Sequence, residues 1–244
     1  GGAQGISGFA YCTGRGKPVD FCVGPGNQYV TEAKRQVSCL VGIDMLAGPS
    51  EAVIIADESV DSRWIAVDAL SRCEHDPNSW SALLLTSEDL AKKVSALIEE
   101  ELKTLKTAEL AAKSWRQNCR MIVVDSLDEA VRISDDIAPE HLQVMCADST
   151  AVAAKLRNFG SLFVGSFAPV PFGDYVSGPN HILPTSRCAR FSNGVNATTF
   201  IKISSIQEIS PEGGRYLAPH CAYLAGLEGL YGHQRSAQLG EKDP

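Results

Sequence analysis

The sequence predicts an α/β fold with mostly parallel sheets. Short apolar runs rich in β-branched residues alternate with longer amphipathic stretches, and turn-forming residues separate the two. This alternation is typical of parallel strands joined by crossover helices. The chain has 244 residues, of which 44% are hydrophobic and 21% charged, so it is long enough for one large domain or two modest ones.

Three strands and three helices are expected in the first part of the chain. The strands are expected at residues 19–23, 52–56 and 82–85. The helices are expected at residues 28–40, at residues 62–74, and from about 86 to 105. The middle strand is β-branched and lies between Gly48-Pro49 and Asp57. The third helix begins with hydroxyl residues followed by carboxylates, as capped helices often do.

The alternation continues through the middle of the chain and then stops. Strands are expected at residues 121–124, 142–146 and 162–164, with helices at residues 127–137 and 150–159. Residues 167–210 are rich in Gly, Pro and Asn, and a functional site is expected in so long an irregular stretch. A single helix is expected at residues 219–239.

Charge and composition exclude several classes of function. The net charge is −7 and no basic stripe is present, which argues against a nucleic-acid-binding protein. No run approaches the roughly 18 apolar residues that a membrane span needs, and no signal peptide is recognisable. The first residue is Gly1 rather than Met, which suits a piece of a longer protein. The eight cysteines form no C-x-x-C pair, which favours free thiols in the cytoplasm.

Two short motifs carry possible binding or catalytic chemistry. Residues 24–27, with sequence GPGN, link an expected strand to an expected helix, where backbone N–H groups and the helix dipole favour a phosphate. The alternative is a tight turn with Asn27 as a helix cap. Glu140 and His141 are adjacent at a helix end and could divide acid and base work, although such a pair is usually a solvated helix terminus.

A third group of polar residues offers metal ligands. Residues 173–185 combine Asp174, Asn180 and His181 with turn-forming residues, and this stretch is either a site or a loop with internal capping bonds. His75, Asp174 and His233 are possible ligands of a catalytic zinc, which usually keeps three protein ligands and an open position. They are far apart in sequence, and a single His near a helix end more often interacts with the helix dipole.

Taken in order along the chain, these segments resemble the histidinol dehydrogenase family. The matching stretches are residues 1–4, 24–27, 29–34, 43–51, 74–75, 138–142 and 173–185. The resemblance covers nearly the whole chain. It implies a zinc- and NAD-dependent oxidoreductase that converts a primary alcohol to a carboxylate through an aldehyde, with two NAD.

The resemblance also implies roles for individual residues. The catalytic pair would be Glu140 and His141. The residues that contact NAD would be Gln4 and Asn27. The zinc ligands would be His75, Asp174 and His233. The residues of the substrate pocket would be Ser50, His181 and Glu228.

The implied fold consists of two Rossmann-like α/β lobes and a C-terminal helical tail, with the N-terminal half of the family fold missing. The expected boundaries are 1–58 for a partial cofactor-side lobe, 59–195 for the metal and catalytic lobe, and 196–244 for a helical segment at a dimer interface. Members of the family are homodimers in which the partner's C-terminal segment helps to close the site.

Two positions depart from the family pattern. The family has a Gln metal ligand where this chain has Arg72, which has no acceptor and cannot bind zinc. The family usually has a Glu where this chain has Val170. We therefore expect Arg72 to face either a protein carboxylate, with Glu74 and Asp76 as candidates, or an anionic group on the substrate.

Three functions follow as alternatives. The first is oxidation of a histidinol-like primary alcohol, with His141 taking the alcohol proton and Glu140 activating water for the second oxidation. The second is the same chemistry on an anionic alcohol such as a dihydroxypropane sulfonate, which Arg72 would bind. The third is a related fold that has lost catalysis and acts as a binding protein.

Overall fold

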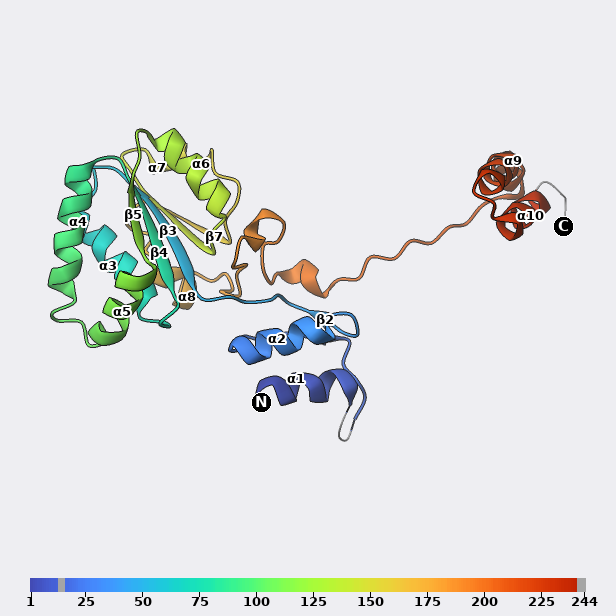
Figure 1. The fold of residues 1–244 in the computed structure, drawn as a ribbon. Helices are drawn as coiled ribbons and strands as arrows, with labels where there is room; N and C mark the ends of the chain where they lie inside the picture. Colours follow the sequence, from blue (N-terminus) through green and yellow to red (C-terminus); the bar gives the residue numbers. More distant parts are fainter. Residues whose placement is uncertain (13–15, 241–244) are drawn as a thin grey trace. The chain divides into compact units, whose positions relative to one another are not determined.

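The computed structural model describes residues 1–12 and 16–240, drawn in Figure 1. The chain divides into two compact units, residues 1–200 and residues 201–244. The first unit contains two parallel sheets, and the second contains helices. The expected α/β class with parallel sheets and C-terminal helices is confirmed.

The larger sheet has five parallel strands in the order β5-β4-β3-β6-β7. The strands are β3 (Glu51–Ala56), β4 (Trp80–Leu85), β5 (Arg120–Val123), β6 (His141–Met145) and β7 (Ser161–Val164). The sequence predicted each of them to within two residues at either end. Although β3 precedes the expected boundary at residue 58, it lies at the centre of this sheet and pairs with β4 and β6.

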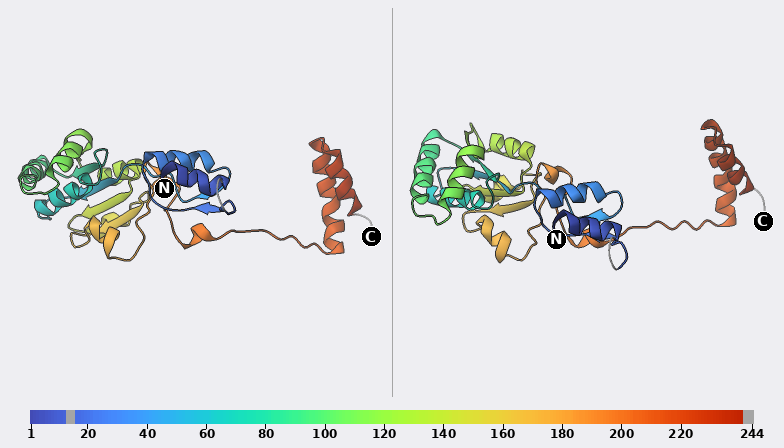
Figure 2. Two further views of the ribbon diagram at one scale, coloured as in Figure 1. Left: turned by 90° about the horizontal axis from the view of Figure 1, so that it is seen from below. Right: turned by 60° about the horizontal axis from the view of Figure 1, so that its bottom comes forward.

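Helices cover both faces of this sheet (Figures 1 and 2). One face packs against α3 (Ser62–Cys73), α4 (Glu88–Glu101) and α5 (Ala108–Asn118), and the other against α6 (Leu127–Ile137) and α7 (Ser149–Ala153). Ile54 of β3 contributes to the first core, and its neighbours Val53 and Ile55 to the second. Because successive strand side chains point to opposite faces, a strand buried on both sides reads as one continuous apolar run.

The start of the chain forms a smaller layer. The parallel strands β1 (Phe21–Cys22) and β2 (Gly42–Ile43) form a two-stranded sheet, and α1 (Gly2–Tyr11) packs against α2 (Gln28–Val37). A buried ion pair between Lys34 of α2 and Asp44, at 2.6 Å, ties the helix to the segment after β2. The sequence predicted β1 and α2 but neither α1 nor β2.

The stretch expected to be irregular contains short helices. These are α8 (Val170–Tyr175) and the 3₁₀ turns η1 (Cys188–Arg190) and η2 (Ala197–Phe200). Ser186 and Arg187 both have positive φ, at 54° and 66°, which is strained for residues other than glycine. The backbone at these two residues therefore forms a tight, strained turn.

The expected helix at residues 219–239 is wrong as a single helix. The second unit contains α9 (Pro211–Leu227) and α10 (Tyr231–Leu239), which pack against each other. Gly229 has φ 73°, and its N–H and that of Leu230 bond back to Gly226 and Ala225 in the pattern that ends a helix. Among the described residues, no helix is long and apolar enough to cross a bilayer.

Candidate active site

The candidate site lies at the amino ends of β3 and β6. The parallel register pairs Ala52 of β3 with His141 of β6, so Glu51 lies beside Glu140 at the start of the two strands. The carboxyl end of α3 reaches the same edge of the sheet and carries Arg72 in its last turn. The negative end of the helix dipole favours a cation at that place.

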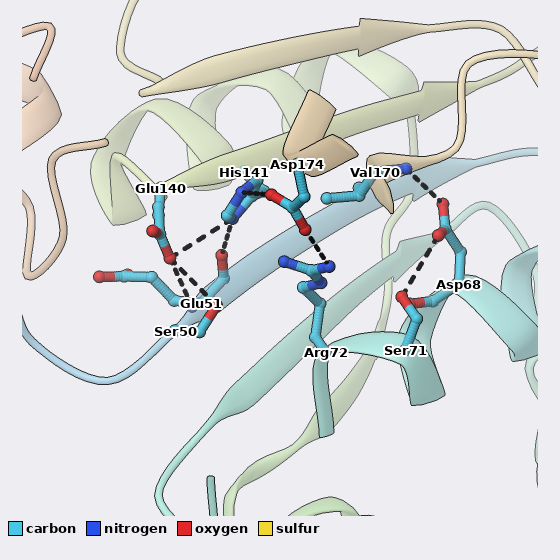
Figure 3. Close-up of polar contacts among 9 residues, drawn as sticks. All are labelled: Ser50, Glu51, Asp68, Ser71, Arg72, Glu140, His141, Val170 and Asp174. Carbon is cyan, nitrogen blue, oxygen red and sulfur yellow. Dashed lines mark hydrogen bonds and ion pairs between the residues drawn. The ribbon is translucent and has the colours of Figure 1, made fainter. Parts of the chain in front are cut away.

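Glu140 and His141 are buried, with exposed fractions of 9% and 3%. They follow Ala138, whose positive φ of 52° ends α6 and turns the chain into β6. Figure 3 shows both side chains directed toward the start of β3. The pair is thus a constrained part of the core rather than a solvated helix terminus.

The backbone of Glu51 holds this pair in place (Figure 3). Its N–H donates to Glu140 Oε2 at 3.1 Å, and its carbonyl oxygen lies 3.2 Å from His141 Nδ1. The hydroxyl of Ser50 donates to the same Glu140 oxygen at 3.2 Å. A proton on Nδ1 shared with the Glu51 carbonyl leaves His141 Nε2 as the atom that can exchange a proton with a substrate.

Asp174 of α8 lies on the other side of His141. Its Oδ1 is 3.6 Å from His141 Nε2, and its Oδ2 accepts a hydrogen bond from Arg72 at 2.7 Å. Burial opposes a charge on His141, but the nearby carboxylates of Asp174 and Glu140 outweigh this and raise the pKa of His141 to about 9. Burial opposes the Asp174 carboxylate in the same way, yet His141 and Arg72 hold its pKa well below its usual value.

The ion pair between Arg72 and Asp174 corrects an expectation. The expected protein partners of Arg72 were Glu74 and Asp76, but Glu74 instead accepts from Thr107, and Asp76 accepts from Asn78. Both lie beyond the end of α3, whereas Arg72 projects inward from its last turn. The Arg72 side chain is 3% exposed, and a protein carboxylate balances its charge.

Two adjoining cavities contain other predicted site residues. Asn27, Ser50 and His75 line a cavity of about 770 Å³. Ser50 also lines a second cavity of about 200 Å³, together with Glu140 and His181. Ser50 therefore connects Glu140 to both cavities.

The remaining predicted residues lie elsewhere. Gln4 is exposed on α1 and lines neither cavity. Glu228 caps the end of α9, and His233 lies in the first turn of α10, so both belong to the unit of residues 201–244. The roles assigned to these three residues stay predictions.

The larger cavity suits part of a dinucleotide. Its size falls in the ordinary range for small-molecule sites. It is bordered by the amino end of α2, where Asn27 accepts from the N–H groups of Tyr29 and Val30. A side chain at Gly26 would meet Val30 at 2.4 Å, so a glycine is required for this turn to close on the helix. The cap explanation for Asn27 is thus correct, and its amide N–H₂ group remains available to a ligand.

The site does not fit a zinc ion. Asp174 already directs one oxygen at Arg72 and the other at His141. Within residues 1–12 and 16–240, no three His, Cys, Asp or Glu side chains come together as a metal-binding group. A permanently charged guanidinium at the centre of the site opposes a divalent cation.

Sequence reasoning did not identify Glu51 and Asp68 as parts of the site. Burial and the nearby Glu140 charge raise the pKa of Glu51 to about 7, and its carboxylate accepts from the N–H of Ser186. Burial raises the pKa of Asp68 to about 6, and Asp68 accepts from the N–H of Val170. Glu51 directly follows Ser50 and precedes an expected strand. A carboxylate at the start of a buried strand is the one feature of the sequence that could have marked Glu51 as part of the site.

The chain is similar to a family of known proteins over nearly its whole length. A family model described as histidinol dehydrogenase matches residues 1–240. Histidinol dehydrogenase of Nitrobacter winogradskyi is 48% identical over 236 residues, which are 97% of this chain and 55% of the relative. That of Agrobacterium fabrum is 46% identical over 98% of this chain and 55% of the relative.

A solved structure shows the same architecture. The crystal structure of histidinol dehydrogenase from Elizabethkingia anophelis matches with a TM-score of 0.90 at 35% identity, over 98% of this chain and 55% of that one. The chain therefore spans about half the length of the relatives it matches.

Proposed function

This chain belongs to the histidinol dehydrogenase family, and from that premise we propose that it is part of an NAD-dependent enzyme that oxidises a primary alcohol to a carboxylate. The observation that carries the proposal is the buried Glu140–His141 pair, which is held by the backbone of Glu51, with Glu140 lining the smaller cavity. A binding protein would have no need of an acid and a base fixed at such a place.

His141 is the proton acceptor of the first oxidation. The Glu51 carbonyl fixes Nδ1, and Asp174 faces Nε2, so the ring is held by contacts on both sides. Nε2 is buried, has no hydrogen-bond partner among the described residues and lies 3.6 Å from Asp174 Oδ1. It would accept the proton in the neutral form of the ring, and because the pKa of His141 is raised to about 9, this form is favoured at alkaline pH. Asp174 stabilises the imidazolium that forms when the alcohol loses its proton.

Glu140 acts in the second oxidation. Its Oε2 accepts bonds from Ser50 and from the Glu51 N–H, which orients the carboxylate. The same carboxylate borders the smaller cavity, where it can take a proton from a water that attacks the aldehyde. Enclosure of the aldehyde between the two steps limits its loss to side reactions.

The cofactor occupies the larger cavity in this proposal. Asn27 and the amino end of α2 would hold a phosphate group of NAD, and His75 lines the same space. When bound, NAD accepts the hydride from the alcohol carbon. Gln4 is proposed as a second residue that contacts NAD, because it lies on α1, which packs beside α2.

Histidinol is the first substrate to test. The Arg72–Asp174 pair removes the reason to expect an anion on the substrate, because Asp174 already neutralises the guanidinium. A dihydroxypropane sulfonate remains the second candidate. Val170 is buried and apolar, whereas the Glu that the family usually has at this position would attract the amine of histidinol. His181 and Glu228 are proposed to complete the substrate pocket.

The test is formation of NADH by the full-length protein with histidinol and with the sulfonate. We expect oxidation of one primary alcohol through the aldehyde to the acid, with two NADH formed per acid. The absence of NADH formation with any alcohol, in a protein that is folded, would exclude the proposal. In that case a binding function is the remaining alternative.

Assembly and location complete the proposal. We infer a homodimer, supported by the exposed apolar residues of the segment after residue 200, where Ile203 and Ile206 are each 94% exposed. The eight cysteines are free thiols, which supports a location in the cytoplasm.

A further inference from the structure

The cluster around Asp174 has the charges of a metal site but no metal-binding geometry. Both oxygens of Asp174 face a nitrogen: Oδ2 is 2.7 Å from Arg72 Nη2, and Oδ1 is 3.6 Å from His141 Nε2 (Figure 3). The carboxylate is 13% exposed and the Arg72 side chain only 3%. The ion pair is therefore an enclosed part of the site rather than a surface contact.

The position of Arg72 is determined by packing. It lies in the last turn of α3, between Ser71, which bonds back to Asp68, and Cys73, which is fully buried in the core. Its guanidinium cannot lose its proton, so a positive charge is present at every pH at which the protein folds. Desolvation and this charge together lower the pKa of the neighbouring His75.

We propose that Arg72 takes the place of a catalytic metal ion at this site, so that the protein binds no divalent metal between His75 and Asp174. The guanidinium supplies the fixed positive charge that balances Asp174, and it fills the space where a metal would contact the carboxylate. The proposal concerns the site of the proposed function, but its test measures metal content and does not depend on turnover.

The experiment is a measurement of metal content by mass spectrometry on the full-length protein in its native assembly. The protein is saturated with zinc and then dialysed against a weak chelator. Wild type is compared with Arg72→Gln, which replaces the cation with a neutral group that has a carbonyl acceptor. Arg72→Lys is the matched control, because it keeps a positive charge and also lacks an acceptor.

We expect wild type and Arg72→Lys to retain almost no zinc, and Arg72→Gln to retain about one ion per chain, an increase of at least about tenfold. His75→Ala in the Arg72→Gln background should abolish that gain, which would locate the ion. Circular dichroism establishes that each variant is folded.

Two results would overturn the proposal. Wild type that retains about one zinc per chain excludes it directly, and this result needs no variant to fold. A folded Arg72→Gln protein that stays as metal-free as wild type shows that Arg72 is not what keeps the metal out. If metal behaves as proposed but no alcohol is oxidised, the proposed function fails while this inference stands.

Discussion

At the scale of single residues, Glu140 and His141 are fixed by the main chain of Glu51 rather than by further side chains. Glutamine at 140 can still accept the bonds from Ser50 and Glu51, and asparagine at 141 can occupy much of the space of the imidazole. The two substitutions can therefore remove acid–base chemistry with little change in the fold.

From this geometry we predict different effects on the two oxidations. His141→Asn should slow both steps, by roughly 10²–10⁴-fold, because proton transfer is needed in each. Glu140→Gln should slow mainly aldehyde oxidation, because His141 remains as the acceptor of the alcohol proton. The rates are measured separately with the alcohol and the aldehyde as substrates. Equal losses in both half-reactions for both variants would contradict this division of roles.

Asp68 gives a prediction about stability and pH. It is 5% exposed, and burial raises its pKa to about 6, above the ordinary 3.8 of an aspartate, even though the Val170 N–H and the Arg72 charge favour the carboxylate. The folded state binds this proton more tightly than the unfolded state does. The free energy of unfolding of the wild type should therefore increase as the pH falls from above 6 toward 4.

Asp68→Asn should therefore stabilise the protein at pH 8, by on the order of 1–3 kcal/mol, and this advantage should vanish near pH 4. Urea unfolding at several pH values measures it. Asp61→Asn is the control, since Asp61 is an exposed cap of α3 that asparagine can replace. An Asp68→Asn advantage that is constant or larger at low pH would show that burial of the charge is not the cause.

At the scale of elements, the strands could be predicted because each is buried on both faces and reads as an apolar run. Helix α1 could not, because its segment contains Gly2, Gly5 and Gly8, which have low helix propensity, and it is stabilised by packing on α2. The end of α9 just before Gly229 could not be predicted either, because a glycine in an amphipathic pattern is compatible with a continuous or a broken helix.

The residues of the site could be predicted only in part. Resemblance to a family identified Glu140, His141 and Asp174, which the structure brings together. The partner of Arg72 could not be predicted, because Asp174 is 102 residues away in sequence and reaches it only through the packing of α8 near α3. Candidate partners chosen by proximity in sequence were wrong for that reason.

The loop that follows α8 gives a prediction about an element. Val195 N–H bonds to the carbonyl of Ile182, one residue after His181, and closes the loop. Gly194 has φ 70°, and a Cβ there would lie 2.2 Å from that carbonyl oxygen. An alanine would therefore break the closure and displace the wall of the smaller cavity.

We expect Gly194→Ala to destabilise the protein by roughly 2–4 kcal/mol and to lower kcat/KM. Gly178→Ala is a matched control: its φ is also positive, at 98°, but no atom lies within 4 Å of the added Cβ. It should cost only the backbone strain, about 1 kcal/mol. Urea unfolding of the three proteins gives the difference, and equal losses for both variants would exclude the collision as the cause.

At the scale of the whole molecule, the chain spans about half the length of its relatives. The first residues of the second unit, 201–210, include several exposed apolar side chains. Ile201, Ile203, Ile206 and Ile209 are exposed there, between polar residues. Exposed isoleucines that recur through a segment with no helix or strand of its own are expected to be buried by a partner surface.

The final prediction follows from the proposed homodimer. Replacing Ile203 and Ile206 together by serine removes two side chains that contact little within the chain, so the fold of each unit should persist. Their burial by a second copy would contribute about 1.5–3 kcal/mol each, and its loss should raise the dimer dissociation constant by about 100-fold or more.

Light scattering during size-exclusion chromatography, over a range of concentrations, measures the mass of the full-length protein. The control replaces Lys202 and Gln207 by serine, which changes the same exposed segment without removing apolar area. We expect the control to keep the wild-type mass and the isoleucine variant to dissociate on dilution. An isoleucine variant that remains folded and keeps the wild-type mass at every concentration would show that these residues do not lie at the interface between copies.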